Sequence, residues 1–343
     1  MLYKAAASSA ALALVCLFML SPGAPAQMDS SEQLSSPLTS EKTSNSEIFV
    51  HDITVTMEGG QTIDWSWTNN RLVVGRPGAN QYYNIYSVSP EGYKLKNLTL
   101  AKEQGVARQH NGNASWHPSG EYFVFTSQNE GSTSYRMSLP GTGLNCNLWL
   151  GDRSGTEFYK ITSLTTSYND PRGVVYPYFS PDGSKLFWAG NTGDYPRTSV
   201  WGKKALYLAD FRFERGEPVI DNVRTLQPGK KKDFYESHGF SPDGYRLIFA
   251  GNLEGQSAYG MDIYTYDLRT GKVENLTESP DEWDEFAGYS PDGNKIVWMS
   301  SKNQSLRYMG FGSTNWKRFL KSELWIMDHD GSDKKQLTFF NEA

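Results

Sequence analysis

One pattern recurs four times along this chain of 343 residues and limits the fold more than any other feature. Each copy joins two apolar, strand-like runs through a Ser-Pro-Asp-Gly turn or a close variant of it. A second unit alternates with the first, and four of its five copies run 13 residues from the first apolar residue to the final Leu or Ile. The fifth copy, from Leu206 to Leu226, is longer. Fixed spacing inside the units and variable gaps between them indicate rigid blocks joined by tolerant loops. The four copies of the first pattern are 114–128, 176–191, 238–252 and 287–301.

The two units together contain four strand-like runs, each bounded by turn residues. Ser-Pro-Asp-Gly suits a type I turn, because Pro presets φ at the second position and Gly closes the fourth. Four antiparallel strands repeated around an axis form the blade of a β-propeller. We therefore predict an all-β propeller of four-stranded antiparallel blades. Five full repeats are visible, at about 61–100, 108–163, 172–226, 234–278 and 281–340.

The shared aspartate of the turn is a candidate catalytic group as well as a turn residue. Asp182, Asp243 and Asp292 occupy the same place in three copies. A catalytic site needs one or two special carboxylates, whereas a turn residue recurs wherever the turn recurs. We therefore interpret these aspartates as structural.

The strings "FSPDGSKLFWAGN" and "LWIMDHDGSDKKQLT" resemble the repeat of the TolB-type β-propellers, and the resemblance extends from about residue 61 to residue 340. It implies a ring of six blades. Residues 47–57, "EIFVHDITVTM", are similar to the outer strands of one more blade. The TolB family carries a small α/β domain before its propeller. No counterpart is visible here, so the partner-binding segment of TolB is not carried over.

The first 46 residues differ from the rest in composition. Lys4, an apolar run through Leu20 and the Ala24-Pro25-Ala26 site predict a secretory signal peptide over 1–26. Residues 27–46 are rich in Ser and Thr and predict a flexible linker before a propeller over 47–343. We therefore expect a periplasmic or secreted protein without a membrane span after cleavage.

Composition and motifs argue against several kinds of function. The net charge is −5 and no basic block is present, so a nucleic-acid partner is not expected. No nucleophile elbow, His-Glu-x-x-His motif or Cys-x-x-Cys pair occurs. After signal cleavage Cys146 is the remaining thiol, and we interpret it as a small buried hydrophobe. A catalytic residue is therefore not assigned.

Polar residues cluster at the start of the innermost strand of several predicted blades. In a propeller these strand ends meet at the mouth of the central channel. The two histidines and the carboxylates could hold a divalent cation there. Alternatively, these groups only line a solvated channel. The residues are His110, Asn111, Asn113, Tyr176, Tyr235, Glu236, His238, Asp284 and Glu285.

Long insertions at 128–147, 191–204 and 302–322 join the second strand to the third strand of their blades. The same connection in successive blades leaves the same face of the disk. Aromatic residues of this kind form binding hot spots and also stack on sugar rings. The loops carry Tyr135, Tyr195, Trp201, Tyr308, Phe311 and Trp316.

Two functions are compatible with these sequence features. The first is a monomeric exported scaffold that binds a protein or a cell-envelope glycan through these loops and the channel mouth. The alternative is a glycan-active enzyme of lyase or hydrolase type, with a cation at the channel mouth and Tyr or His as acid and base. The missing catalytic motifs favour the scaffold.

Overall fold

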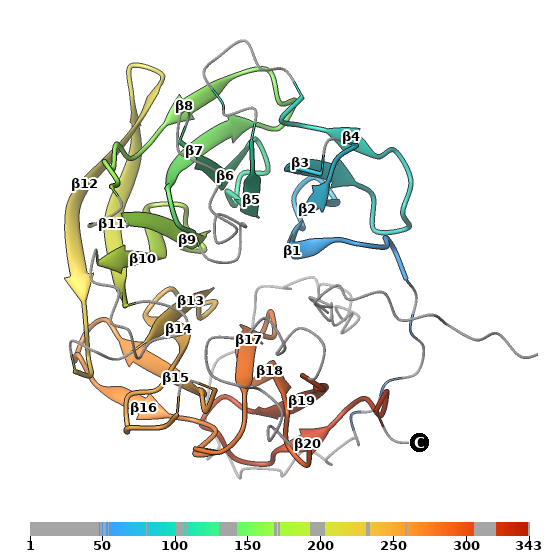
Figure 1. Ribbon diagram of the computed structural model, residues 1–343, viewed down its shortest axis with the longest axis vertical. Helices are drawn as coiled ribbons and strands as arrows, with labels where there is room; N and C mark the ends of the chain where they lie inside the picture. The colour runs from blue at the N-terminus through green and yellow to red at the C-terminus, as the bar shows by residue number, and fades with distance from the viewer. Residues whose placement is uncertain are drawn as a thin grey trace, which may run out of the picture.

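The computed structural model shows five four-stranded sheets arranged around a common axis (Figure 1). No helix occurs among the described residues. The predicted signal peptide and linker lie outside them. The described residues are 48, 50, 53, 55–79, 81–100, 106, 109–129, 143–167, 170, 172–192, 203–230, 234–257, 259–304 and 320–341.

The blades follow one another in chain order, and each contains four strands. Blade 1 comprises β1 (Gln61–Ser66), β2 (Arg71–Pro77), β3 (Tyr83–Val88) and β4 (Lys96–Asn97). Blade 2 comprises β5 (Asn111–Trp116), β6 (Tyr122–Gln128), β7 (Cys146–Asp152) and β8 (Phe158–Lys160). Blade 3 comprises β9 (Arg172–Phe179), β10 (Lys185–Thr192), β11 (Lys204–Glu214) and β12 (Glu217–Leu226). Blade 4 comprises β13 (Tyr235–Phe240), β14 (Arg246–Gly251), β15 (Asp262–Asp267) and β16 (Val273–Asn275). Blade 5 comprises β17 (Asp284–Tyr289), β18 (Lys295–Ser300), β19 (Glu323–Asp328) and β20 (Lys335–Gln336).

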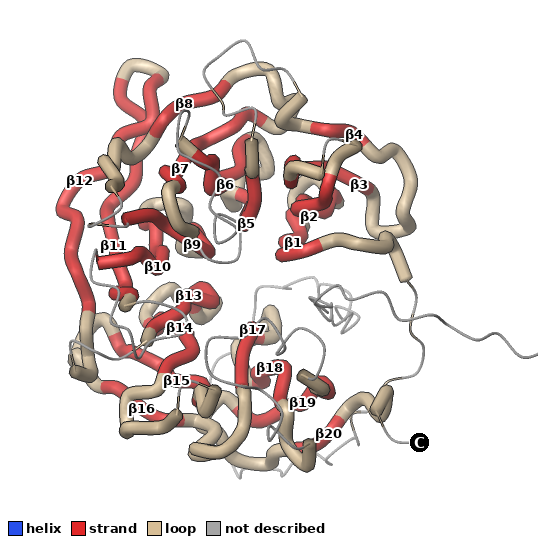
Figure 2. Tube along the Cα trace, in the orientation of Figure 1, coloured by secondary structure: helices blue, strands red, loops and turns tan. Residues whose placement is uncertain are grey.

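Within each blade, strands that are neighbours in the chain pair antiparallel. The first strand of each blade lies nearest the axis and the fourth lies outermost, as the tube in Figure 2 shows. The predicted all-β propeller of four-stranded blades and its five repeats are therefore confirmed. The sixth blade that the resemblance implied is not among the described strands.

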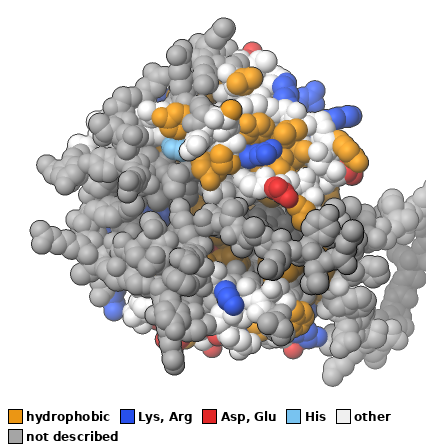
Figure 3. All heavy atoms as spheres, turned by 45° about the vertical axis from the view of Figure 1, so that its right-hand side comes forward, with side chains coloured by type: hydrophobic (Ala, Val, Ile, Leu, Met, Phe, Trp, Pro, Cys, Tyr) orange, Lys and Arg blue, Asp and Glu red, His pale blue; other side chains and the backbone are white. Residues whose placement is uncertain are grey.

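The side between blade 5 and blade 1 differs from the other blade junctions. Consecutive blades pack their sheets on each other, whereas no packing of comparable extent joins the described strands of blades 1 and 5. Ile48 and Val50 pack against blade 5, while Met57 packs against blade 1. None of the described residues of segment 47–57 forms a strand, so the expected outer strands are not confirmed. Figure 3 turns the right-hand side of Figure 1 forward and shows hydrophobic side chains gathered on its upper part.

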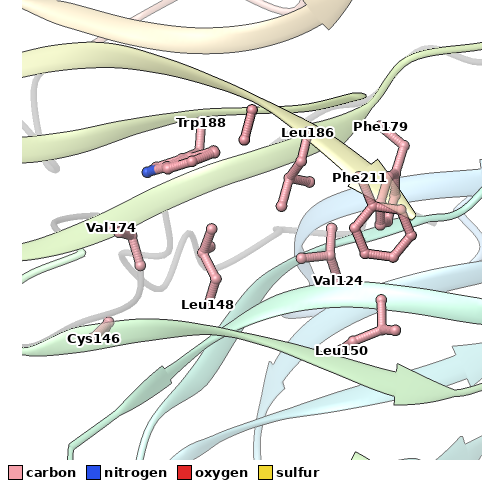
Figure 4. Packing of buried hydrophobic residues seen from close by; sticks show 10 residues of the cluster. Val124, Cys146, Leu148, Leu150, Val174, Phe179, Leu186, Trp188 and Phe211 are labelled. Atoms are coloured by element: carbon pink, nitrogen blue, oxygen red, sulfur yellow. The ribbon is translucent and has the colours of Figure 1, made fainter. Parts of the chain in front are cut away.

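The hydrophobic core consists of layers between consecutive blades. Between blades 2 and 3, Val124 and Leu148 face Val174, Leu186 and Trp188 (Figure 4). All five side chains are buried. A single blade could not bury both of its faces, so stacking in a ring is what makes each sheet stable. Cys146 is buried in the same layer, and burial raises the pKa of its thiol to about 12, as expected of a packing residue.

The turn aspartates have the structural role that the repeat predicted. In the turn after β9, the Ser180 hydroxyl donates to Asp182 at 2.5 Å, and the Ser184 amide donates to the same carboxylate at 3.0 Å. Asp243 and Asp292 accept equivalent bonds in the next two turns. These bonds hold the pKa of each carboxyl below its ordinary value, which is expected of an ionised turn acceptor.

Glycines in the outer hairpins allow blades to approach closely, and one of them provides a test of this packing. Gly155 has a φ of +67°, and a Cβ there would lie 2.3 Å from the Leu98 carbonyl oxygen of blade 1. We expect Gly155→Ala to reduce the free energy of unfolding by about 2 kcal/mol or more, from backbone strain together with the clash. Urea unfolding of the purified chain measures this change.

Gly216→Ala is the matched control for that substitution. Its φ of +88° is equally unfavourable for alanine, but no atom lies within 4 Å of the added Cβ. Gly216→Ala should therefore reduce the free energy of unfolding by the backbone strain alone, about 1 kcal/mol. Equal losses in the two variants would contradict a blade contact at Gly155.

Candidate binding site at the channel mouth

Each innermost strand is interrupted by a β-bulge at a similar position. A bulge places two residues opposite one and redirects a side chain. In four blades a residue other than glycine at the bulge has a positive φ, which costs conformational energy and persists only where packing enforces it. These residues are Thr62, Asn113, Tyr176 and Phe286, with φ of 44–53°.

The bulges bring consecutive blades into hydrogen-bond contact around the axis. Each of the following contacts joins one blade to the next, and we call them together the inner seam. They are Trp116 N to Asp64 Oδ2 at 2.6 Å, Ser115 Oγ to Pro177 O at 2.7 Å, Ser237 Oγ to Tyr176 O at 2.6 Å, and the contacts of His238 with Phe286 N and Ala287 N at 3.3 and 3.2 Å.

His238 is the bulged residue of β13 and links blade 4 to blade 5. The two backbone N–H groups of blade 5 point at its ring nitrogens. A neutral imidazole can accept at one nitrogen, whereas an imidazolium can accept at neither. Burial lowers the pKa of His238 to about 4, although the nearby Glu236 acts in the opposite direction. His238 is therefore a neutral acceptor within the inner seam.

Beside His238 lies a buried group of three ionisable residues and one tryptophan, which we call the charged cluster: Lys204, Glu236, Glu285 and Trp283. The Lys204 Nζ atom lies 3.3 Å from Glu236 Oε1, and both side chains are about 95 % buried or more. The Trp283 indole N–H donates to Glu285 Oε2 at 2.8 Å. Burial, and then the Glu236 carboxylate, raise the pKa of Glu285 well above its ordinary value. The Lys204 ammonium charge partly offsets this rise in the pKa of Glu285.

The charged cluster lies on the face from which the long loops leave. Glu236 and Glu285 lie at the starts of their strands, and they pair with the ends of β14 and β18. Lys204 begins β11 and pairs with the end of β10. The chain leaves β10 at Thr192 and β18 at Ser300 on this same side, toward β11 and β19 respectively. We call this side the loop face and the opposite side, with the Ser-Pro-Asp-Gly turns, the turn face.

The structure brings together four of the nine residues predicted at the channel mouth. Burial raises the pKa of Tyr176 well above its ordinary value, and the charges of Glu236 and Glu285 raise it further. His238 stacks near Phe286, which also contacts the Tyr176 ring. Tyr176, Glu236, His238 and Glu285 therefore lie close together where blades 3, 4 and 5 meet.

The other five predicted residues have separate places in the structure. His110 accepts from the Tyr83 amide at 3.2 Å and belongs to the junction of blades 1 and 2. Asn113 accepts from the Thr126 hydroxyl within its own blade. Asp284 accepts from the Ser279 hydroxyl and from the Trp298 indole, inside blade 5. Asn111 and Tyr235 are buried in the starts of β5 and β13. These five are not grouped with the other four, because neighbouring side chains of one strand point in different directions.

Sequence reasoning missed Lys204, Trp283 and Asp64. Lys204 follows a long insertion and belongs to a third strand, whereas the predicted site drew on first strands only. Trp283 lies one residue before β17. Its position next to Asp284 and Glu285, which were predicted site residues, could have pointed to it. Asp64 has no counterpart in the recurring pattern.

The predicted cation site and the aromatic loops remain predictions. Within the described residues, no group of three or more His, Cys, Asp and Glu side chains could hold a metal ion. His110 and His238 contact different blades. The six loop aromatics, Tyr135, Tyr195, Trp201, Tyr308, Phe311 and Trp316, lie outside the described residues.

Comparison with solved structures identifies the fold family. A TolB protein from Agrobacterium tumefaciens matches with a TM-score of 0.52 and 18 % identity, over 81 % of this chain and 80 % of that one. TolB from Acinetobacter baumannii matches with a TM-score of 0.50 and 19 % identity, over 79 % and 53 %. The fold is therefore that of the TolB-like β-propellers, as the repeat indicated.

Sequence comparison finds two curated relatives that match part of the chain. Dipeptidyl-peptidase 5 from Porphyromonas endodontalis is 31 % identical over 248 residues, which is 63 % of this chain and 32 % of that protein. Dipeptidyl-peptidase 5 from Porphyromonas gingivalis is 30 % identical over 89 residues. The chain thus spans about a third or less of these curated relatives. No family model matches it. In the part of the chain that the structure describes, no helix is long and apolar enough to span a membrane.

Proposed function

We propose that this protein is an exported binding scaffold that holds a polypeptide partner on its loop face. The observation that carries the proposal is that four polar side chains near the axis are engaged in hydrogen bonds of the inner seam. His238, Asp64, Ser115 and Ser237 each bond to an adjacent blade. Side chains held by such hydrogen bonds make the ring of blades more rigid, and they are not available to act as a general acid or base.

The loop face is the proposed contact surface. Three insertions leave it, and their six aromatic residues are proposed as the binding hot spots. The charged cluster lies on the same side and fixes the strand ends from which the loops start. Export is inferred from the signal-like residues 1–26.

A polypeptide is the partner that the comparisons favour. The curated relatives are named for action on peptides, and the part they share with this chain is about a third or less of their length. We infer that the shared part contacts peptide chains rather than cleaving them. The scaffold has more support than a glycan-active enzyme, because the described residues contain no group of three or more potential metal-ligating side chains and the seam histidine is buried.

Crosslinking in the native host tests which face binds. We expect lysine-reactive crosslinks to a partner from Lys203, Lys302 and Lys321 on the loop face. Lys94 and Lys272, in outer hairpins on the turn face, are the internal control. Links concentrated at the control lysines would refute the assigned face. Release of dipeptides from peptide substrates by the purified chain would refute the scaffold itself.

A further inference from the structure

Blades 1 and 5 are neighbours around the axis, but their junction is built differently from those between consecutive blades (Figure 1). At each junction of consecutive blades, one apolar cluster combines residues from both blades. Between blades 5 and 1 there are two separate clusters, and neither contains a described residue of the other blade. We call them the blade 1 face, with Trp65, Leu72, Val74 and Val88, and the blade 5 face, with Leu324, Ile326 and Leu337.

Strand register shows that these two faces correspond to the faces that carry the other junctions. Alternate residues of a strand point to opposite sides of its sheet. In β2, Val73 belongs to the layer shared with blade 2, so Val74 points the other way. In β19, Trp325 belongs to the layer shared with blade 4, so Ile326 points away from blade 4. Each face therefore lies on the side of its blade where another blade would pack.

One short segment of the chain contacts both faces. Ile48 and Val50 pack against the blade 5 face, and Met57 packs against the blade 1 face. The Thr56 hydroxyl also donates to the Pro90 carbonyl oxygen of blade 1 at 2.9 Å. Met57 follows Ile48 by nine positions, and an extended chain of that length can span up to about 30 Å. The segment is therefore long enough to join the two blades.

The apolar residues of this segment differ in how much of their surface is exposed. Ile48 and Val50 are partly buried where they contact blade 5. Between these residues and Met57, Ile53 is 51 % exposed and Val55 is 74 % exposed. Since burial of apolar surface is what stabilises such a contact, the segment is attached near its two ends.

We propose that residues 48–57 act as a strap that holds blades 5 and 1 together, and that release of either end opens the ring on this side. The strap attaches through a few side chains, whereas the layers between consecutive blades are built from the facing sides of two sheets. Opening at this junction should therefore require less free energy than separating consecutive blades. The strap is then the element that decides whether the ring is closed.

Distances between spin labels across this junction test the proposal, measured by double electron–electron resonance on the whole chain. The labels are attached at Lys96→Cys in β4 and Lys335→Cys in β20, which are exposed positions in the outermost strands of blades 1 and 5. Cys146 is buried, so it should not take a label. We expect Ile48→Ser with Val50→Ser to lengthen the distance between the labels by about 5 Å or more, the spacing between neighbouring strands. If this variant does not fold, Ile48→Ala with Val50→Ala is a milder release for the same measurement.

Release at the other end of the strap should have the same effect. Thr56→Val with Met57→Ser removes the hydrogen bond and the apolar contact with blade 1, and it should lengthen the same distance by a similar amount. Combining the substitutions at both ends should lengthen it little further, because a strap that is free at one end no longer joins the blades. Additive changes from the two ends would indicate separate local contacts and would overturn the proposal.

Ile53→Ser with Val55→Ser is the matched control, because it changes exposed residues of the same segment, and it should leave the distance unchanged. A second pair of labels, at Lys272→Cys and Lys335→Cys, spans the junction of blades 4 and 5 and should not respond to any strap variant. The proposal is also overturned if both end variants keep the original distance, or if the control variant lengthens it equally. The measurement needs no partner, so its outcome is independent of the crosslinking result.

Discussion

Lys204→Met should lower the free energy of unfolding by about 3–5 kcal/mol at pH 7, since it leaves a buried carboxylate without its counter-charge. Lys204 Nζ is the ammonium that faces Glu236 at 3.3 Å, and only 2 % of Lys204 is exposed. Methionine fills nearly the same volume, so the loss would come from charge rather than from a cavity. Urea unfolding gives the free-energy difference directly.

A double variant separates the charge effect from packing. In Lys204→Met with Glu236→Gln both charges are absent, and the loss should shrink to about 1 kcal/mol or less. Lys185→Met, which breaks the partly exposed pair with Asp210, should change stability by less than about 1 kcal/mol. If Lys204→Met were no worse than Lys185→Met, the charged cluster would not be desolvated as the structure indicates.

The fold was predictable because the same pattern of turn and strand residues recurs several times along the chain. A turn such as Ser180-Pro181-Asp182-Gly183 followed by an alternating run specifies a hairpin locally, and its recurrence specifies stacked blades. The structure confirms each of these steps. The junction of blades 1 and 5 was not predictable, because Ile48, Val50 and Met57 pack there without forming strands. No local pattern describes contacts of that kind.

The candidate site was predictable only in part, and the reason is geometric. Strand position placed Glu236, His238 and Glu285 near one another. The bulges then decided which neighbouring side chain turned toward the axis, and they share no residue type, as Thr62 and Phe286 illustrate. The ion pair of Lys204 joins a third strand to the first strand of the next blade. Such a contact depends on blade spacing, which sequence periodicity does not encode.

The stability contributed by His238 should fall by about 3 kcal/mol between pH 6.5 and pH 4. Its pKa is about 4 in the folded protein, because burial disfavours the imidazolium, and about 6.5 in the unfolded chain. The unfolded state therefore binds more protons in this range, so acidification favours unfolding. The contribution is fully present above pH 6.5 and is lost progressively toward pH 4.

Comparison with His238→Asn isolates this contribution. Asparagine can accept a backbone N–H through its side-chain oxygen and does not titrate. Glu285 acts in the opposite sense, because its raised pKa makes the folded state bind more protons as the pH falls. Glu285 is present in both proteins, so its effect largely cancels in the difference. Urea unfolding at several pH values should show the stability advantage of the original chain over His238→Asn shrinking as the pH falls from 7.5 to 4. An advantage that stays constant would mean that His238 is not a buried acceptor joining blades 4 and 5.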